Sequence, residues 1–163
     1  MKAASYYDTY TKLVPAGDIV AILESQLEPS IALFCCISEE KSLHRYAEGK
    51  WSIRQVLNHI TDTERVMLSR AYWFARGFGS SLPGMDQDVA AAAARADEVS
   101  LAEHIAEFRT VREATLSFFL NLPKECWSRE GIASDNLFDV EALAYIIAGH
   151  NLHHQNILRS RYL

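Results

Sequence analysis

The chain has 163 residues and lacks both long apolar runs and paired cysteines. No stretch approaches the roughly 20 apolar residues that a membrane-spanning helix needs, and the first residues contain no apolar segment typical of a signal peptide. The three cysteines, Cys35, Cys36 and Cys126, form no CxxC motif. We therefore expect reduced thiols, a cytoplasmic protein without a membrane partner, and small core residues at Cys35 and Cys36.

Several motifs that would define an enzyme class are also absent. The sequence has no HExxH metalloprotease motif, no Walker A loop and no complete GxGxxG fingerprint. No histidine follows a glutamate by three positions, which excludes the Glu-x-x-His pairs of di-iron bundles. The formal net charge is −5 and no basic cluster occurs, so nucleic acid is not expected as a partner.

What the sequence does contain is typical of one soluble globular domain spanning residues 1–163. Helical periodicity dominates, and no convincing alternating strand pattern is present. Two segments begin with a capping box, a serine followed three residues later by Gln or Glu: Ser52 with Gln55, and Ser100 with Glu103. The predicted helices span residues 18–40 (with Pro29 inside), 52–76, 100–120 and 139–163.

A long connection, from Gly77 to about Val99, joins the second and third predicted helices. It is a functional loop, a crossover to a helix that is not adjacent, or both. Four helices of about 20 residues with two long connections predict an all-α fold, a four-helix bundle with crossovers. Bundles of this kind build metal sites in the core from side chains on facing helices.

Three of the six histidines lie in the last predicted helix, in the segment AGHNLHH. His150 and His154 are four residues apart, so they stack on one helix face, near the centre of its apolar stripe. A core histidine with one satisfied hydrogen bond is the usual explanation for a single such residue. Two stacked imidazoles favour a metal ion, because the ion satisfies one nitrogen of each ring.

A metal site needs at least one more ligand from a facing helix. His44 lies in a polar connection and His104 in the first turn of a helix, where we expect solvated or capping roles. His153 points about 100° away from its neighbour His154. His59 remains as the only other histidine in mid-helix, a weak candidate by itself. Three imidazoles describe an open site that suits Zn²⁺, Ni²⁺, Co²⁺ or Cu²⁺.

Three groups of motifs, spread over most of the chain, resemble a known family. The first is GKWSIR at 49–54, followed by LNH at 57–59 and DTER at 62–65. The second is LPGMDQD at 82–88, and the third is AGHNLHHQNILR at 148–159 with RYL at the end. In their order and spacing they resemble the DinB/YfiT-like superfamily of metalloenzymes, and within it the DinB-like domain branch.

The resemblance implies a four-helix bundle with up-down-down-up connections, found as a homodimer. It implies a three-histidine metal site with nickel or zinc, and by motif position its ligands are His59, His150 and His154. Related branches transfer bacterial low-molecular-weight thiols, and one includes a maleylpyruvate isomerase that uses a thiol.

Our leading hypothesis is therefore a metal-dependent enzyme in which the ion lowers the pKa of a bound water or thiol. Transfer of a low-molecular-weight thiol to an electrophilic substrate is its concrete version, favoured by the resemblance and not by a residue pattern. Metal-dependent hydrolysis is the nearest alternative. A non-catalytic dimeric module with a metal-binding or stress-response role is another. Its aromatic surface for a partner would comprise Trp73, Phe74, Phe78, Phe118 and Phe119.

The sequence does not identify a general acid or base. The candidates are Asp62, Glu64, Asp86 and Tyr145. Asp62 lies about one turn from His59 and would orient its ring. Glu64 is expected to form a salt bridge with Arg65. Asp86 is expected to cap a turn, and Tyr145 is expected to make a packing or dimer contact.

Overall fold

The computed structural model describes all residues from 1 to 163, and most of them are helical. Short 3₁₀ turns separate several of the regular elements. The α-helices are α1 (Asp8–Thr11), α2 (Ile19–Cys35), α3 (Ile53–Ala75), α4 (Gln87–Ala94), α5 (Leu101–Leu120) and α6 (Val140–Ile157). The strands are β1 (Glu130–Ala133) and β2 (Asn136–Asp139), and a π-helical turn (Leu158–Tyr162) follows α6.

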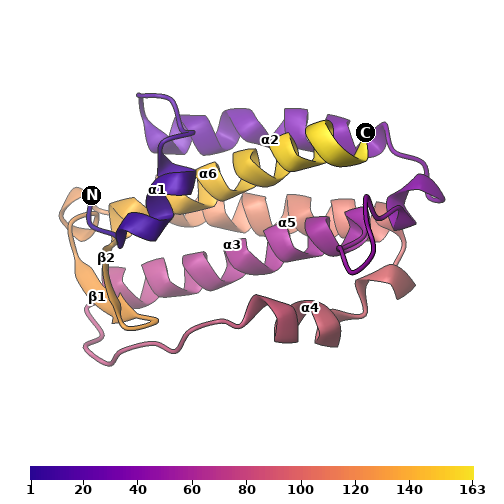
Figure 1. Cartoon of the computed structure of the whole chain (residues 1–163). Helices are drawn as coiled ribbons and strands as arrows, with labels where there is room; N and C mark the ends of the chain where they lie inside the picture. The colour runs from indigo at the N-terminus through magenta and orange to yellow at the C-terminus, as the bar shows by residue number, and fades with distance from the viewer.

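The four long helices α2, α3, α5 and α6 form a bundle, as predicted (Figure 1). Helix α3 packs against α5 and α6, and α2 packs against the same two helices. The consecutive helices α2 and α3 therefore lie diagonally across the bundle, as do α5 and α6, whereas α3 and α5 are neighbours. As a result α3 and α6, which are far apart in sequence, share one of the main contacts of the core.

Both predicted capping boxes start helices in the structure. The Ser52 hydroxyl accepts a hydrogen bond from Gln55 N, and Gln55 Oε1 accepts one from Ser52 N at the start of α3. Ser100 and Glu103 make the equivalent pair at the start of α5. These reciprocal bonds satisfy amide groups that a helix start leaves without partners, so helix starts were readable from local sequence.

Helix α2 is shorter than the predicted 18–40, although it continues through Pro29 as expected. It ends at Cys35, and a 3₁₀ turn (Lys41–Leu43) follows. The segment after Cys35 has other hydrogen-bond partners, because the buried Arg54 guanidinium donates to the Glu39 carbonyl and to Ser42 Oγ. This tertiary contact explains why helical periodicity overestimated the length of α2.

The prediction of an all-α fold is wrong at one element, the β1–β2 hairpin. Its strands pair antiparallel with Glu130 opposite Asp139 and Ala133 opposite Asn136. Four-residue strands are too short for a clear alternating pattern. The turn places Ser134 and Asp135 in the left-handed region, at φ 49° and 59°, without the Asn-Gly or Asp-Gly pair that usually marks such a turn. The local sequence therefore contained little signal for the hairpin.

The long connection between α3 and α5 carries helix α4 and runs along the outside of the bundle beside α3 (Figure 1). Asp86 was expected to cap a turn, and it caps helix α4, which the sequence did not predict: its carboxylate accepts hydrogen bonds from the backbone N atoms of Asp88 and Val89. A backbone bridge between Leu82 and Ala133 joins the connection to the hairpin. At the other end of the connection, Arg54 Nη1 donates to the carbonyl oxygens of Asp97 and Val99. The predicted loop is thus a structured crossover held at both ends.

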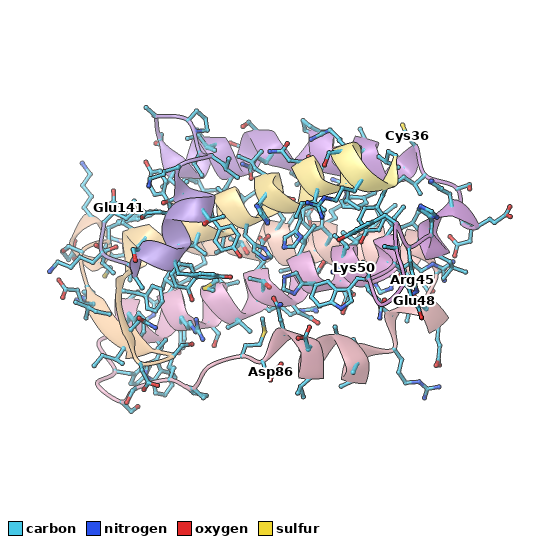
Figure 2. All side chains as sticks on the ribbon, in the orientation of Figure 1. Cys36, Arg45, Glu48, Lys50, Asp86 and Glu141 are labelled. Carbon is cyan, nitrogen blue, oxygen red and sulfur yellow. The ribbon has the colours of Figure 1, made fainter.

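The expectation that Cys35 and Cys36 are small core residues is wrong. Cys35 and Cys36 are exposed at the end of α2, where Figure 2 shows Cys36 at the surface, and only Cys126 is buried. None of the three forms a disulfide. No helix combines the length and the apolar character that crossing a membrane requires.

A buried ion pair joins α3 to α5 and corrects the expected partner of Glu64. The Arg112 Nε and Nη2 atoms each donate a 2.7 Å hydrogen bond to the Glu64 carboxylate, and both side chains are buried. Arg65 instead binds Asp62 and Glu107 at the surface. Two parallel charge-assisted bonds fix the relative position of the two helices. Glu64 therefore serves the bundle and not the chemistry.

Gly149 lets α1 lie directly on α6. A Cβ atom at this position would be 2.2 Å from the Tyr10 carbonyl oxygen, far inside van der Waals contact. Because the obstructing atom belongs to the backbone, a side-chain rotation cannot relieve the overlap. Helix α1 thereby brings Tyr10 next to the ring of His150, with 5.2 Å between the ring centroids.

We expect Gly149→Ala to destabilise the protein by about 1–3 kcal/mol, because α1 must move off α6. This figure is a net loss of stability, because alanine inside a helix is more stable than glycine by about 1 kcal/mol and offsets part of the steric cost. The free energy of unfolding in urea measures it. Gly79→Ala is the control, since a Cβ there meets nothing within 4 Å. Equal stability of the Gly149→Ala protein and the wild type would contradict the close contact.

Candidate metal centre

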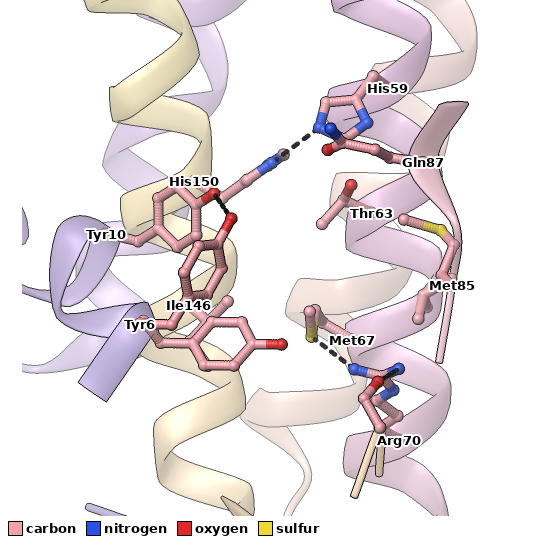
Figure 3. A pocket seen from close by; sticks show the side chains of 13 residues that line it. Tyr6, Tyr10, His59, Thr63, Met67, Arg70, Met85, Gln87, Ile146 and His150 are labelled. Carbon is pink, nitrogen blue, oxygen red and sulfur yellow. Dashed lines mark hydrogen bonds between the residues drawn. The ribbon is translucent and has the colours of Figure 1, made fainter. Parts of the chain in front are cut away.

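Three histidine side chains from two helices meet inside the bundle. His59 comes from α3, and His150 and His154 come from adjacent turns of α6. The Nε2 atom of His150 lies 3.1 Å from Nε2 of His59 and 3.1 Å from Nε2 of His154. Figure 3 shows the rings of His59 and His150 facing each other across the gap between their helices.

Each ring is held by its surroundings. His59 is buried and lies 4.8 Å from the Trp51 ring, measured between centroids. His150 is buried beside Tyr10. His154 is only half-buried and keeps part of its surface open. The faces of α3 and α6 that pack against each other in the core thus carry the three imidazoles at the same height along the bundle axis.

The surroundings keep all three imidazoles neutral at neutral pH. Burial lowers the pKa of His59 to about 4, although the nearby Asp88 carboxylate opposes the shift. Burial is the main cause that holds the pKa of His150 well below its usual range, and the rings of His154, His59 and His153 lower it further. Burial and the neighbouring rings also lower the pKa of His154. Neutral rings have the free lone pairs that a metal ion requires.

This donor set fits a metal ion better than a hydrogen-bonded cluster. A neutral imidazole nitrogen has either one proton or one lone pair, so Nε2 of His150 can pair well with only one of its two neighbours. A cation accepts the lone pairs of all three. Donors about 2 Å from a tetrahedral zinc lie about 3.3 Å apart; two of the three separations are close to this, at 3.1 Å, and all three donor atoms lie within 4.8 Å of one another. No fourth His, Cys, Asp or Glu joins the group, so one side is open.

Two cavities reach the histidines from different sides, each of about 260 Å³. The first, the tyrosine cavity, contains His59 and His150; the second, the tryptophan cavity, contains His154. Gln87 of α4 lines both. The tyrosine cavity is lined by Tyr6, Tyr7, Tyr10, His59, Thr63, Val66, Met67, Arg70, Met85, Gln87, Ser134, Ile146 and His150. The tryptophan cavity is lined by Tyr46, Gly49, Lys50, Trp51, Val56, Gln87, Asp88, His154, Ile157 and Tyr162.

Asp88 is the only carboxylate in either cavity, and the sequence did not single it out. It lies in the first turn of α4, lines the tryptophan cavity with His154, and acts electrostatically on His59. The sequence offered one signal: if Asp86 caps a helix, then Asp88 belongs to that helix. Only the packing of the crossover on the bundle places this carboxylate at the histidines.

The model of the DinB superfamily matches residues 22–158. The chain belongs to the DinB superfamily. A comparison with curated proteins gives no significant match.

Solved structures with this fold share little sequence with the DinB-superfamily chain. YfiT from Bacillus subtilis, described as a "probable metal-dependent hydrolase with an unusual four-helix bundle topology", has 14% identity and a TM-score of 0.71, covering 86% of this chain and 84% of YfiT. A mycothiol-dependent maleylpyruvate isomerase has 8% identity and a TM-score of 0.72, covering 89% of this chain but 61% of the isomerase. The DinB-like protein YjoA from Bacillus subtilis has 21% identity and a TM-score of 0.62, covering 88% and 87%. These likenesses show the fold.

The other predicted acid–base candidates of this DinB-superfamily protein lie outside both cavities. Asp62 does not orient His59: it makes no hydrogen bond to that ring, and its Oδ1 atom accepts a 2.9 Å hydrogen bond from Arg65. Asp86 is the cap of α4. The Tyr145 hydroxyl is 3.4 Å from the Gly17 carbonyl oxygen, consistent with a packing role.

The remaining histidines stay apart from the group of three. His44 is exposed, as expected. His104 was expected at the surface or as a cap, but it is buried, and its Nε2 atom lies 2.8 Å from the Ala96 carbonyl oxygen. Its partner belongs to the crossover, which the local sequence could not indicate. His153 contacts Tyr10 and does not belong to the group of three.

Proposed function

We propose that the protein is a metal-dependent enzyme whose ligands are His59, His150 and His154, with Zn²⁺ or Ni²⁺ as the ion. A bound divalent ion would supply positive charge that lowers the pKa of a water or thiol at the open position. The convergence of three neutral imidazoles from α3 and α6 supports the site. The metal-dependent description of YfiT, which shares the fold, agrees with it.

The reaction that we propose is transfer of a low-molecular-weight thiol to an electrophilic substrate. The observation that carries it is the pair of cavities, which reach the histidines from two sides and share Gln87. Hydrolysis brings one organic substrate to the site, whereas thiol transfer brings two. The mycothiol-dependent isomerase of similar fold also uses a thiol.

We propose that Asp88 takes the proton that the thiol loses. Asp88 lines the tryptophan cavity, as His154 does, and the thiol would bind in this cavity. In the overall reaction the S–H bond breaks and the proton passes to the carboxylate. The sulfur forms a bond to the electrophilic carbon, and the leaving group departs with its bonding electron pair. Tyr10, whose pKa is raised mainly by burial, remains a phenol and a hydrogen-bond donor on the opposite side.

Metal-dependent hydrolysis is the second candidate, and the description of YfiT favours it. It would use the same three histidines with water in place of the thiol. A non-catalytic metal-binding or stress-response module is the third. Three protein ligands support an enzyme over this module, because structural zinc sites are usually closed by a fourth.

The metal content of the purified protein tests the ligand assignment. We expect about one zinc or nickel ion per chain, and loss of most of it in His59→Ala, His150→Ala and His154→Ala, since each change removes one of three donors. Elemental mass spectrometry of tag-free protein, purified without added metal or chelator, measures this. His44→Ala is the matched control because this side chain is exposed. A His154→Ala protein with full metal content would refute the site.

Thiol transfer is tested with cysteine and 1-chloro-2,4-dinitrobenzene, by following the absorbance of the thioether. We expect catalysis by metal-loaded protein, none with His154→Ala, and a rate lower by about 100-fold with Asp88→Asn, because the proton acceptor is lost. Glu24→Gln, an exposed carboxylate on α2, serves as the control. Turnover of ester or amide substrates without any thiol transfer would favour hydrolysis instead.

We propose that a second copy of the chain is the partner, and that the helices run up-down-down-up. The crossover along the length of the bundle supports this helix order (Figure 1). Of the aromatic residues expected at a partner surface, Phe74 and Phe119 are buried, which corrects that expectation. Trp73, Phe78 and Phe118 remain at least partly exposed. A sedimentation mass of 18.4 kDa, that of one chain, would contradict the homodimer.

The cytoplasm is the compartment that we propose. All three cysteines are free, and the adjacent pair Cys35 and Cys36 is exposed. Exposed free thiols persist in a reducing compartment.

A further inference from the structure

Three arginines are buried in this protein, and one of them has no carboxylate partner. Arg112 binds Glu64, and Arg54 binds Glu39. Arg70 is only 3% exposed, yet no Asp or Glu lies within salt-bridge distance of it. A buried charge without a counter-ion is unfavourable, because neutral partners do not replace the solvation lost.

The existing partners of Arg70 leave part of its guanidinium unused. Its Nη2 atom donates to the Pro83 carbonyl oxygen at 3.0 Å and to Ser134 Oγ at 2.9 Å. Its Nη1 atom contacts only the Met67 sulfur, at 3.8 Å, which is a weak acceptor. Donors of Arg70 therefore remain for an anion that the protein does not supply.

Arg70 lines the tyrosine cavity together with two of the three clustered histidines. Figure 3 shows it at the end of the cavity away from His59 and His150. His59 and Arg70 are eleven residues apart on α3, about 16 Å along the helix axis. The cavity thus has a buried cation at one end and the proposed reaction centre at the other.

Thr63 provides an independent indication of a ligand in the same cavity. It is buried on α3 between His59 and Arg70, and its hydroxyl group has no hydrogen-bond partner in the protein. Buried polar groups are nearly always paired, so a polar atom of a ligand or a water is expected beside it. The walls between these polar groups include Met67, Met85 and other apolar side chains.

We propose that the tyrosine cavity binds an organic acid whose carboxylate pairs with Arg70 and whose reactive carbon lies at the histidines. This proposal rests on the proposed function and names the class of its electrophilic substrate: a small, elongated carboxylic acid with a partly apolar body. The cavity volume of about 260 Å³ lies just below the usual range for drug-sized ligands, which agrees with a small acid.

A purely structural role for Arg70 predicts different behaviour. Its bonds to Pro83 and Ser134 tie the crossover and the hairpin turn to α3, so replacing it would loosen both segments. That role would change stability but would give no preference for an acid over its amide. The test therefore compares hexanoate with hexanamide, which differ in charge and hardly in shape.

The experiment is a titration of the full-length protein, metal-free and zinc-loaded, with hexanoate, hexanamide and inorganic phosphate, followed by calorimetry and by NMR. We expect the wild type to bind hexanoate at least about tenfold more tightly than hexanamide in both forms, with shifts at the Arg70 side-chain N–H and at Ser134. Arg70→Gln should abolish the preference. Arg76→Gln, an exposed arginine at the end of the same helix, should keep it.

Several results would overturn the proposal: no preference in the wild type, a preference that survives in folded Arg70→Gln, or shifts confined to residues outside the cavity. Phosphate binding at Arg70 about tenfold more tightly than hexanoate would overturn the carboxylate as the anion. If Arg70→Gln does not fold, the NMR shifts of the wild type at the Arg70 side-chain N–H and at Ser134 decide whether the carboxylate binds there. A chain that binds hexanoate but no metal would refute the proposed function and, with it, the role of the acid as substrate, while the carboxylate site at Arg70 would stand.

Discussion

The contact between α3 and α6 is the constraint on which the candidate site depends. Its packing buries His59 and His150 and brings their Nε2 atoms to 3.1 Å, where burial keeps the rings neutral. Neutral imidazoles at this spacing are poor partners for one another and good ligands for a cation. The packing that stabilises the bundle thus also holds the donors in place. The buried Arg112–Glu64 ion pair likewise fixes the position of α5 against α3.

The walls of the cavities, in contrast, come in part from segments outside the four long helices. Helix α1 contributes Tyr10, which lies on α6 because Gly149 has no side chain. The crossover contributes Gln87 and Asp88, and the hairpin turn contributes Ser134. Variation in these connecting segments would change what reaches the histidines without disturbing the bundle, as is common for functional loops on rigid scaffolds.

The buried arginines also divide between those that stabilise the bundle and one that faces a cavity. Two buried arginines, Arg54 and Arg112, have carboxylate partners and tie elements together. Arg70 is held by neutral oxygens and faces a cavity instead. The protein therefore combines a group of neutral donors, one nearby carboxylate at Asp88, and one uncompensated cation at the far end of a cavity. This polarity suits a substrate bound in one orientation.

Local sequence predicted the four long helices and two of the three clustered histidines. The capping boxes at Ser52 and Ser100 and the spacing of His150 and His154 depend on neighbours within one helical turn, so they were readable directly. His59 remained by elimination as the only other histidine in mid-helix. It was a weak candidate, which the family resemblance strengthened, because its approach to α6 involves residues distant in sequence. Only the tertiary structure revealed the hairpin, the burial of His104, the pairing of Glu64 with Arg112 and the isolation of Arg70. Each depends on a partner from another element, and neither periodicity nor spacing carries information about such a partner.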